Sequence, residues 1–405
     1  MPSLKWTNAQ VFLVTEFPWS VTVAWMGSYL SLFLLDQGLS ARNLGWTIGA
    51  GAVIQLLGLG LSGSITRRLG RKGTIMSGDF GGWVVALGIW ALSHNPWILA
   101  LGLVMNQASG YVGPAWNSLF SEDEHSARLP RYFLTLQILT IMGGLILPLT
   151  RGFVVQDGVV ASGHSLLLVF WPCVSAVWVI RWLALRESAA GRMSMGRTQR
   201  LAWRERAAHI HQGLSGPGFY LAALRVLSTV PFLIVAAFVP LALVSPHGPH
   251  VAPGDLTLLP LGAVSGVILL GIGRRVARRW TALHFMGMGL ALVAAGFAVL
   301  AWAPQGHVIW VLAGWGLMVA GQSQFASSHT SIWMTWLPDV IRVDVQGWIG
   351  MVTAAGVAVL SPLLADQFVR NPRVVFGIMA VVFTAALGLW RPLRKLMAQT
   401  EHNES

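Results

Sequence analysis

Three charged side chains lie within long apolar runs, where insertion scales give a charge a cost of about 2.5–3.5 kcal/mol. Glu16 is in the first run, Asp79 in the third and Arg225 in the seventh, and Glu16 and Arg225 are 209 positions apart (225 − 16). A carboxyl group at this depth can carry a proton, and a guanidinium can bind a carboxylate or a phosphate. We therefore expect Glu16 and Arg225 to face each other across a polar cavity and to pair there or bind charged parts of a ligand. The alternative is that each side chain snorkels to the membrane surface.

Uncharged polar side chains also gather in two of the runs. The fourth run holds Asn106 and Gln107, and the tenth holds Gln322 and His329, which are seven positions apart and share one face of a helix. These side chains are candidates for lining the cavity, although hydrogen bonding between neighbouring helices would also explain them. Because histidine titrates near neutral pH, His329 is a second candidate for carrying a proton.

The composition indicates that these residues are positioned by membrane-spanning helices. The chain is 55% hydrophobic and 10% charged, against about 25% charged residues in soluble domains, and its mean hydropathy is +0.63. A spanning helix needs about 20 apolar residues. The predicted spans are 10–35, 44–65, 74–92, 96–119, 132–151, 164–186, 219–243, 255–272, 281–302, 307–336, 346–365 and 373–391.

The basic residues predict the orientation of these spans. With both termini in the cytoplasm, 22 Lys and Arg fall in cytoplasmic segments or adjoining span ends, Arg181 among them, and 4 fall outside. This asymmetry is the positive-inside pattern. The net charge of +12 is therefore assigned to membrane topology, and no nucleic acid partner is expected.

The two halves of the chain resemble each other. The turn after the second run carries Arg67, Arg68, Arg71 and Lys72, and four arginines with the same spacing begin at Arg274, 207 positions later (274 − 67). Duplicated halves around a central site are a recurrent plan of transporters. We expect an N-terminal six-helix bundle over 1–186, a basic cytoplasmic linker over 187–218, and a second bundle with a short cytoplasmic tail over 219–405.

The turn after the second run resembles the signature of the major facilitator superfamily, Gly-x-Leu-Ala-Asp-Arg-x-Gly-Arg-Arg/Lys. The matching residues are Gly63, Arg68, Gly70, Arg71 and Lys72. The resemblance implies an all-α integral membrane protein with 12 transmembrane helices in two pseudo-symmetric six-helix bundles.

The turn departs from the signature at Arg67, which replaces an acidic residue that in the family braces the cytoplasmic gate. The resemblance implies that Arg71 can still pair with Glu122 or Asp123 after the fourth run. We expect Asp79 to pair with the basic turn or a helix end, in place of the missing acid. The arginine of proton-coupled drug exporters is also absent, because Asn106 occupies its register.

The resemblance implies a secondary transporter that moves a small organic solute across the plasma (inner) membrane by alternating access, with proton coupling left open. A multidrug-type exporter is the alternative within this class. A transporter-like sensor that binds solute without flux is the alternative of another class. We expect no enzyme activity, no cofactor and no metal. The expected partners are a small-molecule substrate and the lipid bilayer, with protons left open, and the chain is expected to be a monomer.

Overall fold

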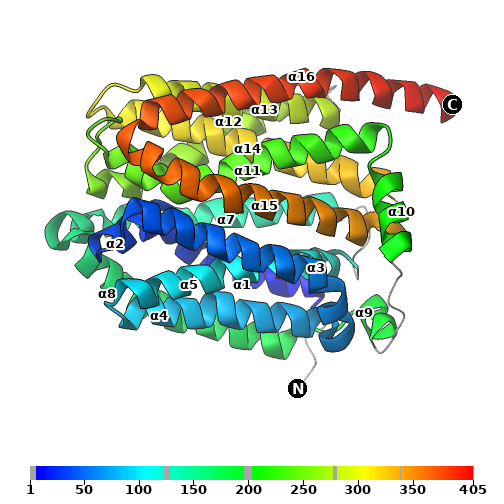
Figure 1. Cartoon of the computed structure of the whole chain (residues 1–405), viewed down its shortest axis with the longest axis horizontal. Helices are drawn as coiled ribbons and strands as arrows, with labels where there is room; N and C mark the ends of the chain where they lie inside the picture. Colours follow the sequence, from blue (N-terminus) through cyan, green and yellow to red (C-terminus); the bar gives the residue numbers. More distant parts are fainter. Residues whose placement is uncertain are drawn as a thin grey trace. The chain divides into compact units, whose positions relative to one another are not determined.

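The computed structural model describes residues 6–122, 124, 128–195, 203–276, 281–337 and 339–404. These ranges are almost entirely helical and contain no strand (Figure 1). The α-helices are α1 (Asn8–Trp25), α2 (Ser31–Asp36), α3 (Ala41–Asp79), α4 (Ala86–Leu92), α5 (Pro96–Ala108), α6 (Gly113–Ser121), α7 (Leu129–Gly144), α8 (Arg151–Ala184), α9 (Ala189–Ser194), α10 (Trp203–Gly213), α11 (Pro217–Val244), α12 (Leu259–Val276), α13 (Ala282–Trp302), α14 (Val308–Trp336), α15 (Asp339–Arg370) and α16 (Pro372–Glu404). Arg278 and Arg279 of the second basic turn, and Asp123, lie outside the described residues.

Eight described helical stretches are long and apolar enough to cross a membrane. Two of them, Ala41–Leu92 with 52 residues and Arg131–Ala184 with 54, are more than twice the length of about 20 residues that one crossing requires. Each contains a glycine with positive φ, Gly70 (φ +74°) and Gly158 (φ +78°), where the helix breaks and resumes. The chain is therefore a multi-pass, all-helical membrane protein, and the number of twelve spans stays a prediction.

Local sequence explains where several helices begin. Thr7 precedes α1 and forms a capping box with Gln10, in which each side chain receives the other residue's backbone N–H. Ser40 caps α3 by accepting the N–H of Asn43 at 3.2 Å. Asn95 caps α5 in the same way, and Pro96 follows as the first helical residue.

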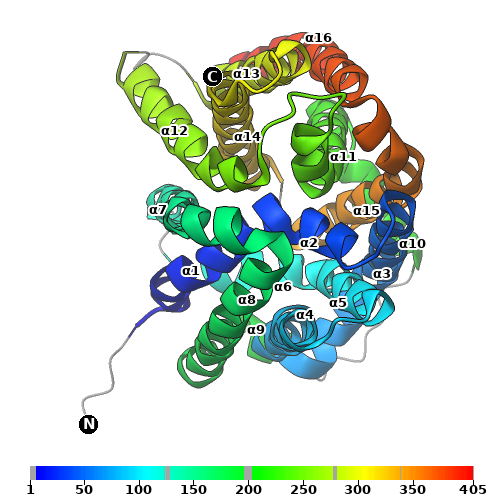
Figure 2. The same ribbon diagram turned by 90° about the vertical axis from the view of Figure 1, so that its left-hand side faces the viewer.

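By its contacts the chain divides into two compact units. Unit 1 is Met1–Arg200 with Ala354–Leu363, and unit 2 is Leu201–Thr353 with Leu364–Ser405. In unit 1, α1 packs on α7 and α8, α3 on α5, and α4 on α8. In unit 2, α13 packs on α14 and α16, and α12 on α14 (Figure 2). The bundle boundaries predicted from the sequence, on either side of 187–218, stay a prediction.

Glycines allow the helices of unit 2 to pack closely. A Cβ built on Gly289 of α13 would lie 2.7 Å from the carbonyl oxygen of Gly321 in α14, and one built on Gly296 would lie 2.6 Å from that of Gly314. Real Cβ atoms essentially never approach so closely, so these positions require glycine. Small residues at helix contacts are typical of membrane proteins, because association there depends on close packing of the backbones.

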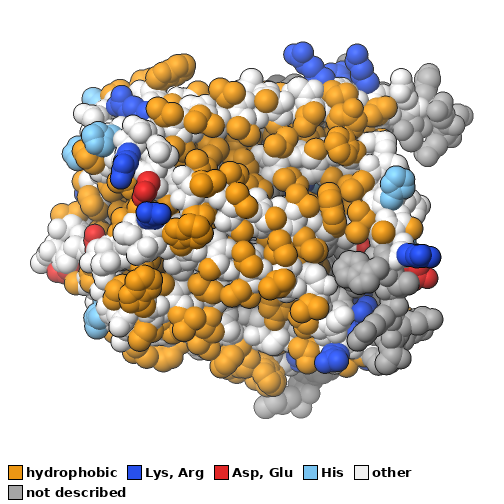
Figure 3. Space-filling view, viewed as in Figure 1, with side chains coloured by type: hydrophobic (Ala, Val, Ile, Leu, Met, Phe, Trp, Pro, Cys, Tyr) orange, Lys and Arg blue, Asp and Glu red, His pale blue; other side chains and the backbone are white. Residues whose placement is uncertain are grey.

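The outward-facing side chains of both units are largely apolar. Trp302 is 83% exposed, Leu149 78% and Ile309 74%. On the face drawn in Figure 3, hydrophobic side chains predominate, and charged ones lie mainly toward its left and right margins. Exposed apolar surface on this scale is typical of a surface covered by lipid.

Candidate functional site

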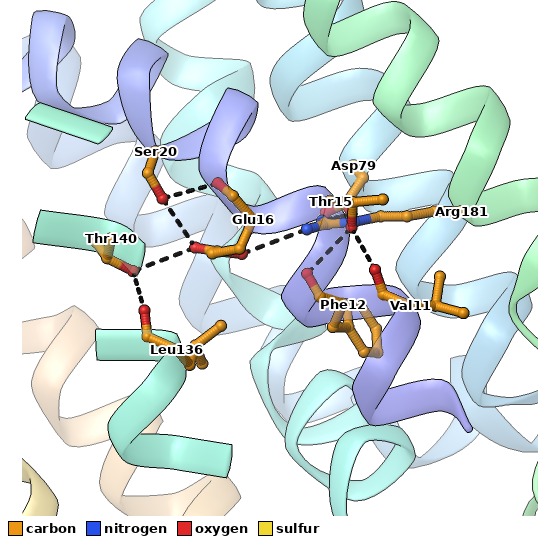
Figure 4. Close-up of polar contacts among 9 residues, drawn as sticks. All are labelled: Val11, Phe12, Thr15, Glu16, Ser20, Asp79, Leu136, Thr140 and Arg181. Carbon is orange, nitrogen blue, oxygen red and sulfur yellow. Dashed lines mark hydrogen bonds and ion pairs between the residues drawn. The ribbon is translucent and has the colours of Figure 1, made fainter. Parts of the chain in front are cut away.

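Three charged side chains from three helices meet inside unit 1 (Figure 4). Glu16 comes from α1, Asp79 from the end of α3, and Arg181 from the last turn of α8. Their side chains are 13%, 6% and 2% exposed. We refer to Glu16, Asp79 and Arg181 as the charge cluster.

The Arg181 guanidinium is the centre of the charge cluster. Its Nη2 lies 3.4 Å from Glu16 Oε2 and its Nη1 lies 3.7 Å from Asp79 Oδ2. Its Nε donates to Thr15 Oγ1 at 2.9 Å. The Thr15 hydroxyl in turn donates to the carbonyl oxygen of Val11 at 2.8 Å, which orients the Thr15 oxygen toward Arg181.

The other carboxylate oxygen of Glu16 accepts hydrogen bonds from two hydroxyl groups. Its Oε1 accepts from Ser20 Oγ and from Thr140 Oγ1 of α7, both at 3.3 Å. Ser20 lies four residues after Glu16 and therefore on the same face of α1. The Glu16 carboxylate thus joins α1 to both α7 and α8.

Aromatic rings cover the guanidinium. The Arg181 Cζ lies 4.7 Å from the ring centroid of Trp19 and 5.2 Å from that of Phe12. Trp19 packs in turn on Trp83, with ring centroids 4.4 Å apart. The rings attract the cation and exclude water, so that the ion pairs act in a low effective dielectric.

The charge cluster contains two carboxyl groups and one guanidinium. Asp79 Oδ2 is buried and has no hydrogen-bond partner. The single positive charge of Arg181 cannot neutralise two carboxylates. One of the two carboxyl groups can therefore also bind a proton. Such an arrangement can bind and release a proton when solvent reaches it, and it can exchange ion-pair partners.

The structure adds detail to two expectations about these residues. Arg181 was expected at the cytoplasmic end of a span; it lies in the last turn of α8, and its side chain is buried among charges and rings. Asp79 was expected to pair with the basic turn or a helix end, and its ion-pair partner is Arg181 in the last turn of α8. Arg181 lies between the apolar pairs Val179-Ile180 and Trp182-Leu183, and this flanking is the signal that could have identified it. Glu16 and Arg225 belong to different units, and their pairing stays a prediction.

A second polar cluster surrounds the predicted cytoplasmic gate motif. Arg71 forms an ion pair with Glu122 at the end of α6, which is one of the two contacts expected from the sequence. Ser188 connects the pair, because its hydroxyl donates to Glu122 at 2.6 Å and accepts from Arg71 Nη1 at 3.1 Å. Arg67, which replaces the signature's acid, donates to Ser64 within the same turn. Among the other motif residues, Gly63 and Lys72 are half-buried and Arg68 is exposed.

Sequence reasoning missed Glu187 in this cluster. Helix α3 breaks at Gly70 and resumes at Arg71, and Glu187 Oε2 accepts the backbone N–H of Lys72 at 3.0 Å. The carboxylate therefore satisfies an N–H that the break would otherwise leave without an acceptor. No local pattern points to Glu187, because it lies 115 positions from Lys72 in the chain.

The remaining candidates differ in their contacts. Asn106 donates to the carbonyl oxygen of Gly82 at 2.7 Å, so it holds two helices together. Gln107 is half-buried in α5. In unit 2, His329 Nε2 lies 2.9 Å from the carbonyl oxygen of Leu221, and its ring stacks on Trp333. Arg225 and Gln322 are half-buried in α11 and α14.

The Arg71–Glu122 pair is open to a double-mutant cycle. We expect Arg71→Gln and Glu122→Gln each to reduce the free energy of unfolding. The double variant should lose about 1 kcal/mol less than the sum of the two single losses, because the second substitution acts on a chain in which the ion pair is already broken. Denaturant unfolding in mixed micelles measures this coupling. The matched control pairs Glu122→Gln with Arg68→Gln, whose exposed side chain should give additive effects. Additivity in the Arg71 cycle as well would contradict a stabilising ion pair.

Comparison with known proteins identifies the fold. No protein-family model matches the sequence, and no curated protein matches it. Three solved structures illustrate the matches over the whole chain. The nucleoside transporter NupG has a TM-score of 0.65 at 11% identity and covers 96% of this chain and 100% of its own. The peptide transporter POT in complex with sulfate has a TM-score of 0.67 at 14% identity, covering 97% and 94%. The human organic anion transporter MFSD10 has a TM-score of 0.63 at 12% identity, covering 95% of each. These are transporters of the major facilitator superfamily, and the chain has the fold of that superfamily.

Proposed function

We propose that the chain is a secondary transporter that moves a small organic solute across the plasma (inner) membrane by alternating access. The proposal includes twelve spans in two six-helix bundles, over 1–186 and 219–405, joined by the linker 187–218. It also includes cytoplasmic termini and a monomeric state. The fold and the similar structures, which are nucleoside, peptide and organic anion transporters, support this class of function.

The single observation that carries the mechanism is the charge cluster. Charged side chains are rare within membrane spans and mark ion or substrate pathways when they occur. Here two carboxyl groups compete for one guanidinium, and Glu16 also contacts Thr140 of α7. We infer that Glu16 gains and loses the coupling proton. Protonation of Glu16 would leave Arg181 paired with Asp79 alone and would weaken the link between α1 and α8. The helices would then have two arrangements, one with the Glu16–Arg181 ion pair and one without it.

The test is transport by the purified chain in proteoliposomes with an imposed pH gradient. The solute panel is a set of nucleosides, dipeptides and organic anions, the classes of solute carried by the similar transporters. With one coupled proton, we expect each pH unit of the gradient to change the accumulation of a transported solute by up to about tenfold, because one proton moving down one pH unit supplies about 1.4 kcal/mol. In Glu16→Gln the gradient should have no effect, because a glutamine cannot exchange a proton.

Asp157→Asn is the matched control, since Asp157 is an exposed carboxylate in α8 and should leave the gradient dependence unchanged. Flux that ignores the gradient in the native chain would contradict proton coupling while leaving transport in place. Binding of solutes without flux of any of them would favour the sensor over the transporter.

A further inference from the structure

Three polar groups on α11 and α14 in unit 2 lack partners. Among the described residues, the Arg225 side chain has no ion pair and no hydrogen bond, and it is half-buried. Thr229 Oγ1 and Gln322 Oε1 are buried and have no hydrogen-bond partner. Unpaired polar groups are costly at membrane depth, because lipid offers them no donor or acceptor.

Neighbouring polar side chains on α14 do have partners. His329 contacts the carbonyl oxygen of Leu221, and Gln324 donates to Ser328 at 3.0 Å. In unit 1, the buried Arg181 pairs with two carboxylates. Arg225, Thr229 and Gln322 thus differ from the polar side chains around them. Arg225 differs from Arg181 in having no anion beside it in the described part of the chain.

The packing of α11 on α14 gives the three unpartnered groups similar heights along the two helices. Gly218 contacts Trp336 and Leu221 contacts His329, so the two helices run in opposite directions. Starting from the contact between Leu221 and His329, Thr229 lies about 12 Å along α11 and Gln322 about 10 Å along α14, at 1.5 Å per residue. Because the helices are antiparallel, Thr229 and Gln322 are displaced from this contact in the same direction. Arg225 lies between the contact and Thr229, about 6 Å along α11.

The chemistry of the three groups is complementary to an oxyanion with a neighbouring donor. A guanidinium presents a planar fork of N–H groups that matches a carboxylate or a phosphate. The Thr229 hydroxyl can donate to the same anion, and the Gln322 carbonyl oxygen can accept from an amine or hydroxyl beside it. Binding such a ligand would satisfy all three groups at once.

We propose that Arg225, Thr229 and Gln322 form a binding subsite for a carboxylate or phosphate that carries an adjacent hydrogen-bond donor. The inference rests on the proposed transport function, because it identifies the chemical class of the solute. Hydroxy acids, amino acids and phosphate esters with a free hydroxyl belong to this class.

Binding measurements with matched probes test the proposal on the full chain in lipid nanodiscs. The probes are lactate against lactamide, mandelate against mandelamide, and glycerol 3-phosphate against glycerol. We expect at least one anion to bind saturably and at least about tenfold more tightly than its neutral counterpart, as charge-assisted hydrogen bonds imply. The first two pairs test a carboxylate and the third tests a phosphate.

Three variants assign the binding to Arg225. Arg225→Gln should lose the preference for the anion, and Arg225→Lys should keep part of it, because the charge remains. Arg370→Gln, which alters an exposed arginine at the end of α15, should bind as the native chain does. Arg225→Gln should also keep the native melting temperature without ligand, since its charge has no partner to lose. A markedly lower melting temperature would show that Arg225 has a structural partner and would overturn the proposal.

The outcomes for this subsite and for transport are distinguishable. If every anion binds no better than its neutral counterpart, or if Arg225→Gln binds the anion as tightly as the native chain, the subsite is wrong even where flux is observed. If an anion binds through Arg225 but no solute is carried across the membrane, the subsite stands and the transport function fails.

Discussion

Replacing Arg181 with Gln is expected to lower the free energy of unfolding by about 3–5 kcal/mol, the usual effect of removing one partner from a buried ion pair. The substitution would leave the carboxylates of Glu16 and Asp79 in an apolar environment without a cation. It would also remove the donor to Thr15 and the cation packed on Trp19. Denaturant unfolding in mixed micelles measures the loss.

A rescue experiment separates the unpaired charge from simple loss of packing. We expect the triple variant Glu16→Gln, Asp79→Asn, Arg181→Met to recover most of the lost stability, because replacement of all buried charges by neutral groups is often close to neutral. Arg186→Gln is the control, since its side chain is exposed, and it should stay within about 0.5 kcal/mol of the native chain. A triple variant no more stable than Arg181→Gln would contradict the proposed electrostatic cause.

The second large effect is expected at Gly70, where Ala should cost about 2–4 kcal/mol. The backbone there has φ +74° and ψ 175°, a conformation that is essentially restricted to glycine and strained by about 1–3 kcal/mol in other residues. A Cβ at this position would also collide with Oε2 of Glu187, the oxygen that caps the resumed helix at Lys72. Displacing that carboxylate adds the cost of a lost cap, about 1 kcal/mol.

Two other glycines of unit 1 divide this effect into its parts. Gly158 has nearly the same backbone conformation, φ +78° and ψ 174°, but a Cβ there would meet no atom within 4 Å. Gly158→Ala therefore measures strain alone and should cost less than Gly70→Ala. Gly152 near the start of α8 has helical angles and open space, so Gly152→Ala should be neutral or stabilising by about 0.4–1 kcal/mol. Equal losses at Gly70 and Gly158 would show that the contact with Glu187 contributes nothing.

Part of the site could be predicted from sequence because its signals are local. Glu16 and Asp79 are visible as charges within apolar runs, and the motif around Arg71 implied an acidic partner at Glu122. Arg181 was assigned by its distance from a span end, which does not report the direction of its side chain. Its last-turn position in α8 is compatible both with snorkelling and with burial, and only contact with α1 and α3 distinguishes them.

The residues alone are enough to predict a multi-pass helical membrane protein, because apolar runs of this length must satisfy every backbone hydrogen bond within a helix. They also reveal three charges within apolar runs, on α1, α3 and α11, because the run around each is visible in the residues alone. Which of them are paired could be learned only from the packing of the helices. Glu16 and Arg181 are 165 positions apart, and Lys72 and Glu187 are 115 apart. Such partners are chosen by how the helices pack, and helix packing follows from the shapes of many side chains together, which no local pattern records.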